Sequence, residues 1–188
     1  MGRWEPEPRA RLEQAALQLY GERGFEQTTV AEIAKRAGLA ERTFFRHFAD
    51  KREVLFGGAA AFNNFLVESV TGAPDSVAPL DAIATALVTA AAFFEDRRDL
   101  VRQRQTIIEA NVDLQERELI KLAALASALA VALRRRGVKD PAASLAAEAG
   151  VAVFKIAFSR WVNERSRTNL KKLIRRSFED LKAVTTGA

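Results

Sequence analysis

The sequence predicts an all-α protein, and three observations lead to that prediction. Apolar residues recur at three- and four-residue spacing along nearly the whole chain of 188 residues. No stretch alternates apolar and polar residues for long enough to form a half-buried strand. The five prolines fall between the periodic segments, where helices begin or the chain turns. We therefore expect helices over 8–22, 29–36, 40–47, 51–70, 79–95, 97–109, 113–136, 140–164 and 168–184.

Composition narrows the class of protein. Apolar residues make up 48% of the chain, so it can bury a core. Cysteine is absent, which excludes disulfides and a cysteine nucleophile and fits a cytoplasmic location. The N-terminal segment lacks the apolar core of a secretion signal, and charges interrupt the alanine-rich runs, so we expect no membrane partner. The formal net charge of +5 is compatible with a polyanionic partner.

The first three expected helices are joined by sharp turns. The first helix ends at Gly24, and Thr28 or Thr29 can accept a hydrogen bond from the free amides of the second. Glu32 stands close to capping-box spacing behind these threonines. Gly38 follows the second helix, where a residue in the left-handed conformation is needed to turn the chain. This pattern is typical of a helix-turn-helix.

The third expected helix presents basic and aromatic side chains. Phe44 and Phe48 lie four residues apart and should pack inward with Leu39. The side chains left facing outward or along the flank are Arg42, Thr43, Phe45, Arg46 and His47. Residues 35–52 contain six basic and two acidic side chains, a local charge of +4. A short basic helix of this kind fits the major groove of B-DNA.

His47 is the only histidine of the chain, and it allows two interpretations. One ring N–H can be donated to a phosphate oxygen even when the imidazole is neutral. The alternative is a histidine on the helix surface that has no role.

Four short motifs within residues 9–56 form a specific pattern. They are GERGF at 21–25, TTVAEIA at 28–34, AGL at 37–39, and TFFRHF at 43–48 followed by Lys51. With these motifs the segment resembles the N-terminal DNA-binding domain of the TetR family of bacterial transcriptional regulators. The resemblance implies that Thr43, Phe45 and His47 touch DNA and that Thr29 and Lys51 hold phosphates. With the basic residues of the third helix, the expected DNA-binding set is Thr29, Arg42, Thr43, Phe45, Arg46, His47 and Lys51.

The rest of the chain suits the variable C-terminal domain of that family. The segment 145–162 is apolar on nearly every side, so both of its faces need cover. By the resemblance, the last two long helices pair across a two-fold axis, and the expected interface anchors are Val153, Phe154, Phe158 and Trp161. The alternative is a core helix within a monomer.

The resemblance also implies an effector cavity in this domain. The residues expected to line it are Phe62, Phe65, Phe93, Phe94, Gln103 and Ile107. Each of these aromatic residues can instead belong to the core, because aromatic side chains at helical spacing usually pack. Between the two domains, Gly57 and Gly58 suggest either a hinge or close packing.

Together these features predict an N-terminal three-helix helix-turn-helix DNA-binding domain at 1–50 and a C-terminal helical ligand-binding and dimerisation domain at 51–188. We expect a TetR-type repressor that a small, mostly apolar effector releases from a palindromic operator. The expected partners are double-stranded operator DNA, the small-molecule effector and a second copy of the chain.

A second class of function stays open. No catalytic, metal-binding or cofactor-binding residues are expected, because the chain has one histidine and neither a nucleophile elbow nor a phosphate-binding loop. The rival interpretation is a helical ligand- or protein-binding adaptor without sequence-specific DNA binding. The third helix distinguishes the two, because an adaptor has no use for an exposed face of Arg42, Arg46 and His47.

Overall fold

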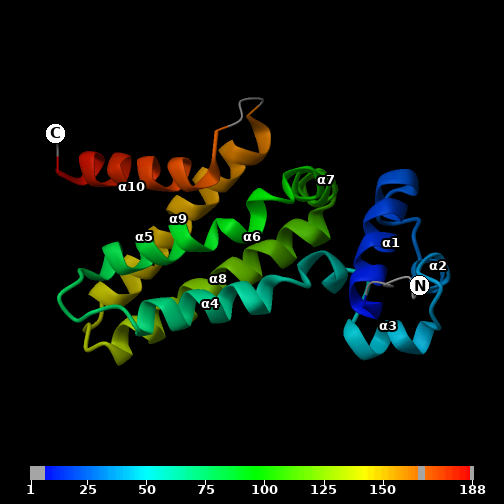
Figure 1. The fold of residues 1–188 in the computed structure, drawn as a ribbon, viewed down its shortest axis with the longest axis horizontal. Helices are drawn as coiled ribbons and strands as arrows, with labels where there is room; N and C mark the ends of the chain where they lie inside the picture. The colour runs from blue at the N-terminus through cyan, green and yellow to red at the C-terminus, as the bar shows by residue number, and fades with distance from the viewer. Residues whose placement is uncertain (1–6, 165–167, 187–188) are drawn as a thin grey trace, which may run out of the picture. The chain divides into compact units, whose positions relative to one another are not determined.

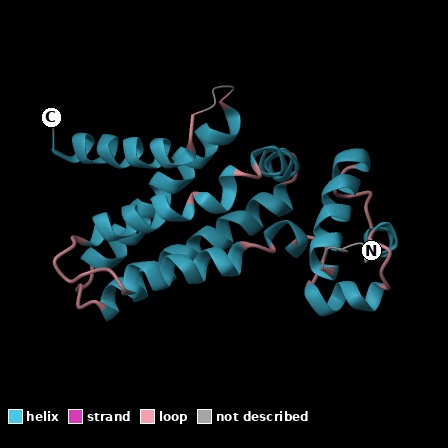
Figure 2. Cartoon of the chain, viewed as in Figure 1, coloured by secondary structure: helices cyan, strands magenta, loops and turns pink. Residues whose placement is uncertain are grey.

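The computed structural model describes residues 7–164 and 168–186, and this part of the chain folds into helices joined by turns (Figure 2). The all-α prediction is confirmed. In chain order the elements are α1 (Pro8–Arg23), α2 (Val30–Arg36), α3 (Glu41–His47), a 3-10 helix η1 (Glu53–Phe56), α4 (Ala59–Thr71), α5 (Pro79–Ala90), α6 (Ala92–Glu95), α7 (Arg98–Glu109), α8 (Val112–Arg135), α9 (Ala142–Asn163) and α10 (Leu170–Thr186). Two expected helices are divided, because 51–70 contains η1 and α4, and 79–95 breaks at Ala91 into α5 and α6.

The chain divides into two compact units. One unit, called the head here, consists of Met1–Gly58 and Gln103–Arg117, and the other, called the body, consists of Ala59–Arg102 and Glu118–Ala188. This division differs from the sequence-based boundary after residue 50. Helices α7 and α8 each run from one unit into the other.

In the head, α1, α2 and α3 form the expected helix-turn-helix arrangement (Figure 1). Thr29 caps α2 through a complete capping box with Glu32, as the spacing predicted. Gly38 adopts a φ of 65°, the left-handed conformation that the turn between α2 and α3 requires. Phe44 and Phe48 are buried, which confirms the predicted inward face of α3.

A segment far along the sequence completes the core of the head. Ile107 and Ile108 near the end of α7 and Leu114 near the start of α8 are buried with Leu12, Phe44 and the other core residues of this unit. Polar contacts reinforce this packing. Gln103 donates to the Leu17 carbonyl at 3.2 Å, and Arg104 donates to the Leu55 carbonyl at 2.6 Å. The head is therefore built from two stretches of chain.

The two consecutive glycines have different surroundings. Arg9 donates a hydrogen bond to the Gly57 carbonyl at 2.5 Å, and a Cβ at Gly57 would collide with the Glu13 carboxylate. A Cβ at Gly58 would meet open space. Close packing at Gly57 and a hinge at Gly58 both stay predictions, because the Glu13 carboxylate is the end of a flexible, partly exposed side chain that can move aside.

The body is organised around α9, which packs against α5 and α10, while α4 packs against α5. Its core includes Leu66, Ile83, Leu129, Trp161 and Ile174, one from each of five helices. The C-terminal end of α9 is held by α7. Arg98 donates to the Trp161 carbonyl at 2.6 Å, and Arg102 donates to the Val162 carbonyl at 2.6 Å. Cations at a helix C-terminus satisfy its free carbonyls and interact favourably with its dipole.

Among the described helices, α9 is long and apolar enough to cross a membrane by length and composition alone. From the sequence, no such segment is expected, because charges interrupt the alanine-rich runs. The buried helix of a water-soluble domain has the same composition, because several of its faces contact protein. Since α9 packs against α5 and α10, its composition is not evidence for a membrane span.

The two-part head leads to a stability prediction. Ile108 is 0% exposed, so Ile108→Ala should lower the free energy of unfolding of the head by about 2–5 kcal/mol through lost burial and a cavity. Val112 is 69% exposed in the same stretch, so Val112→Ala is the matched control and should change the stability by less than about 0.5 kcal/mol. Urea unfolding followed by circular dichroism measures both. Equal effects of the two substitutions would contradict the assignment of residues 103–117 to the head.

Candidate functional site

The exposed face of α3 carries two arginines and one aromatic ring. Arg42 and Arg46 are exposed, and neither has a hydrogen-bond or ion-pair partner within residues 7–164 and 168–186. Phe45 is 54% exposed, and its ring packs edge-on against buried Phe44 with 5.5 Å between centroids. Thr43 lies half-buried on the flank of the helix. This face therefore offers free guanidinium groups and a supported apolar ring.

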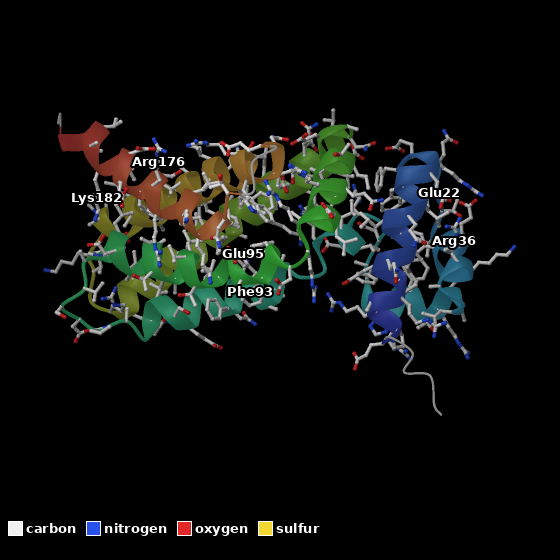
Figure 3. The ribbon with its side chains drawn as sticks, turned by 45° about the horizontal axis from the view of Figure 1, so that its top comes forward. Glu22, Arg36, Phe93, Glu95, Arg176 and Lys182 are labelled. Carbon is white, nitrogen blue, oxygen red and sulfur yellow. The ribbon has the colours of Figure 1, made fainter. Side chains whose placement is uncertain are left out.

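Other basic residues near α3 are bonded within the head. Arg36 makes two hydrogen bonds to the Glu22 carboxylate, at 2.9 and 2.8 Å (Figure 3). These hydrogen bonds lower the pKa of Glu22. Arg52 is bonded to Asp50 at 3.1 Å. Of the basic side chains counted in residues 35–52, only Lys35, Arg42 and Arg46 have no internal partner in the described part of the chain.

Asp50 organises the turn that follows α3. It accepts hydrogen bonds from the backbone N–H groups of Arg52 and Glu53, at 2.8 and 3.1 Å, and its carboxylate lies 3.4 Å from Arg117. Partial burial raises its pKa, but the hydrogen bonds from the Arg52 side chain and from these two amides outweigh that effect and lower the pKa overall. Asp50 thus ties the turn to the distant segment 103–117.

Lys51, expected at a phosphate, has its ammonium group bonded inside the head. Its Nζ donates to the carbonyls of Phe25, Glu26 and Thr28, at 2.9, 3.2 and 3.2 Å. The same ammonium lies 4.3 Å from the centroid of the Phe25 ring. The Lys51 carbonyl accepts a hydrogen bond from the Tyr20 hydroxyl at 2.6 Å. Burial raises the pKa of Tyr20, so the hydroxyl keeps the proton that it donates.

Thr29 is hydrogen-bonded within the head, and His47 is partly buried there. The Thr29 hydroxyl donates to the Glu32 carboxylate at 2.9 Å and accepts from the Glu32 backbone N–H at 3.3 Å. The hydrogen bonds from Thr29 lower the pKa of Glu32. His47 is half-buried, and its Nε2 is buried without a hydrogen-bond partner among the residues that the structure describes. Contacts of Thr29 and His47 with DNA stay predictions.

The expected effector residues fall into two groups. Phe62, Phe65, Phe93 and Phe94 come together in the body, with ring centroids 5.3–6.1 Å apart. Phe93 is exposed and lies on α6 close to Glu95, whose Oε1 is buried without a hydrogen-bond partner in the described residues (Figure 3). Gln103 and Ile107 belong to the contacts and the core of the head instead.

The residues expected to anchor a dimer belong to the same aromatic cluster. Phe154 lies 5.3 Å from Phe62 and 5.5 Å from Phe158, which lies 5.9 Å from Trp161. Val153, Phe154 and Trp161 are buried in the body, and Phe158 is half-buried against its core. This placement differs from the sequence-based expectation, because these side chains have little surface left for a second subunit.

A different stripe of α9 faces outward. Leu145 and Ile156 are 67% and 57% exposed. Ala149 and Ala152 lie between them at helical spacing and are partly or fully exposed. Positions 145, 149, 152 and 156 follow helical periodicity and could have indicated this stripe from the sequence, but the larger aromatic residues of the same helix gave the stronger signal for an interface.

Comparisons with known proteins match both parts of the chain. The sequence profile described as "Bacterial regulatory proteins, tetR family" matches residues 13–56. The profile described as "MftR C-terminal domain" matches residues 77–186, which is more than half of the chain.

Two curated relatives are similar in sequence. The HTH-type transcriptional regulator TcmR of Streptomyces glaucescens is 37% identical over 78 residues, which are 42% of this chain and only 34% of that protein. The putative mycofactocin biosynthesis transcriptional regulator MftR of Mycobacterium tuberculosis is 25% identical over 158 residues, which are 82% of this chain and 80% of that protein.

The fold is also found among solved structures. A complex of SmeT with triclosan matches with a TM-score of 0.68 and 20% sequence identity, covering 96% of this chain and 91% of that one. At this identity the likeness shows the fold alone.

Proposed function

The chain belongs to the TetR family of bacterial regulatory proteins, and on that premise we propose that it represses transcription from a two-fold symmetric DNA operator and that a small, mostly apolar effector releases it. The observation that carries the proposal is the exposed face of α3, where Arg42 and Arg46 stand free beside Phe45. Such a helix can enter the major groove, where arginines reach guanine edges or phosphates and an apolar ring contacts a thymine methyl.

The aromatic cluster of the body supports the effector part of the proposal. Its rings offer apolar and edge-to-face contacts, and exposed Phe93 gives a ligand an approach to Phe62 and Phe65. The buried Oε1 of Glu95 lacks a partner in the described part of the chain, so a hydrogen-bond donor on the effector would satisfy it. SmeT, which shares the fold, was solved as a triclosan complex. Triclosan is therefore a suitable first probe.

The exposed stripe of α9 supports a homodimer. Ala152 at its centre is small enough for two copies of α9 to cross closely, and Leu145 and Ile156 flank it. Exposed Glu148 and Lys155 have no ion-pair partner among the described residues. When two copies pack antiparallel across a two-fold axis near Ala152, Glu148 of one lies beside Lys155 of the other. Two copies of the stripe, one from each subunit, are thus complementary in charge and can also bury each other's apolar side chains.

We propose that the chain binds DNA and an effector and catalyses no reaction. Members of the family are DNA-binding transcription factors, and we assign no catalytic residue in this chain. A regulator of this kind acts on the chromosome, so we place it in the cytoplasm. A dimer would set two α3 helices on adjacent half-sites of a near-palindrome, about one helical turn apart.

Arg46→Ala tests the proposed DNA surface. It should lower affinity for an operator enriched from random duplexes by about tenfold or more, because it removes a charge-assisted contact that no internal bond replaces. Arg36→Ala is the matched control, since Arg36 is bonded to Glu22, and it should keep the affinity within about threefold. Fluorescence anisotropy at fixed salt measures both. A larger loss with Arg36→Ala than with Arg46→Ala would contradict the proposed surface.

Ile156→Glu tests the dimer. A charge in the middle of the stripe should convert the protein to monomers, which sedimentation velocity detects, while circular dichroism should stay unchanged because Ile156 is exposed. Glu148→Lys should weaken the dimer through like-charge repulsion, and adding Lys155→Glu should restore it. A dimer that tolerates Ile156→Glu would place the interface elsewhere.

Triclosan titration tests the effector site. Trp161 lies in the aromatic cluster, and in a Trp4→Phe background it is the only tryptophan, so its emission should change saturably as triclosan binds. Phe93→Ala should weaken this binding, whereas Leu100→Ala, at an equally exposed apolar residue outside the cluster, should not. Binding that is indifferent to Phe93→Ala would move the site away from these rings.

A further inference from the structure

We infer that Glu41, the first residue of α3, selects cytosine at one position of each operator half-site, where its carboxylate accepts a hydrogen bond from the amino group of the base. Glu41 is not among the residues expected to bind DNA, which are basic, aromatic or neutral. The inference rests on the proposed function, because it concerns which base sequence the head recognises.

The position of Glu41 is the first argument. Its helix turns Phe44 into the core of the head. The exposed residues of that helix are Glu41, Arg42, Phe45 and Arg46. Glu41 therefore shares one surface with the two unpaired arginines, and it lies one helical turn before Phe45. When a recognition helix enters the major groove, the residues at its N-terminal end contact the base edges.

The unpaired state of the carboxylate is the second argument. Glu41 has no hydrogen-bond or ion-pair partner within residues 7–164 and 168–186. By contrast, the carboxylates of Glu22, Glu32 and Asp50 in the same unit each accept a hydrogen bond from an arginine side chain. The Glu41 carboxylate is thus available to a donor outside the protein.

The donors of the major groove decide what this carboxylate can bind. The phosphates, the O6 and N7 atoms of guanine and the O4 atom of thymine are all acceptors, so they repel it. Cytosine and adenine each present an amino group, but the amino group of adenine stands beside the acceptor N7. Cytosine therefore satisfies the carboxylate with the least repulsion. A guanine or thymine at the same place would leave a charged group desolvated without a partner.

The negative charge also contributes to discrimination against wrong sequences. A carboxylate on a DNA-binding surface opposes the phosphate charge, so it weakens binding to DNA of any sequence. The bond to cytosine offsets this loss only at sites that contain the base. Glu41 thus raises the ratio of specific to non-specific affinity, because it acts against the competing sites.

Two substitutions at Glu41 test the inference, with Glu109→Gln as the matched control. Glu41→Gln keeps the size of the side chain, removes the charge and gives an amide that pairs best with adenine. Glu41→Ala removes the acceptor altogether. Glu109 is an exposed acidic residue of the same unit on α7, so Glu109→Gln removes an equal charge outside the proposed surface.

Each protein selects duplexes from a random pool, and fluorescence anisotropy at fixed salt then measures affinity for the wild-type site and its single-base variants. We expect wild type and Glu109→Gln to select cytosine at one symmetric pair of positions, where another base lowers the affinity by about tenfold or more. Glu41→Gln should select adenine there, and Glu41→Ala should accept any base there, with the other preferences unchanged. Both Glu41 variants should bind non-specific DNA more tightly than wild type.

Two results would overturn the inference alone. One is an operator whose base preferences stay the same in Glu41→Gln and Glu41→Ala. The other is an equal loss of affinity for every sequence, which would show that Glu41 acts only on the helix, through its dipole. If wild type enriches no operator, the proposed function fails and the inference falls with it.

Discussion

The proposed DNA-binding surface of the head depends on one distinction, between cationic side chains that are paired within the protein and cationic side chains that are not. Arg36, Lys51 and Arg52 have such internal bonds, to Glu22, to three backbone carbonyls and to Asp50. Lys35, Arg42 and Arg46 have none in the part of the chain that the structure describes. The basic residues of this region therefore form two groups. One group is bonded within the helix-turn-helix, and the other projects from it.

Much of this fold could be predicted from sequence because local patterns determine it. Gly38 marks the turn, the Thr29 and Glu32 spacing marks the start of α2, and the spacing of Phe44 and Phe48 marks the inner face of α3. Contacts between distant segments could not be predicted in this way. Residues 103–117 join the head through Ile107, Ile108 and Leu114, whose spacing shows that they are buried but not in which unit. The bonds of Lys51 depend on carbonyls more than twenty residues earlier, which leave no pattern of side chains.

The large aromatic residues of α9 are a second case in which contacts between distant segments could not be predicted from the sequence. Trp161 and Phe154 look like interface anchors in a helix that is apolar all round, yet both are buried inside the body. Phe154 packs with Phe62 and Phe94, and Trp161 packs with Phe158. Leu145 and Ile156, with Ala152 between them, are among the side chains of α9 that stay exposed. Helix α7 contributes contacts to each of the two units. Arg98 and Arg102 bond to the end of α9 in the body, and Gln103 and Arg104 bond within the head.

The most direct measurement of the central claim is the salt dependence of wild-type binding to its enriched operator. If each of the three free cations in each of two heads neutralises one phosphate, about six phosphates are contacted, which corresponds to a slope of log affinity against log salt of about −5. If the internally bonded cations also bound DNA, the number of contacts would double and the slope would approach about −11. If only the unpaired cations bind DNA, we expect a two-fold symmetric operator and the shallower slope. The steeper slope, or the absence of any enriched operator, would contradict it.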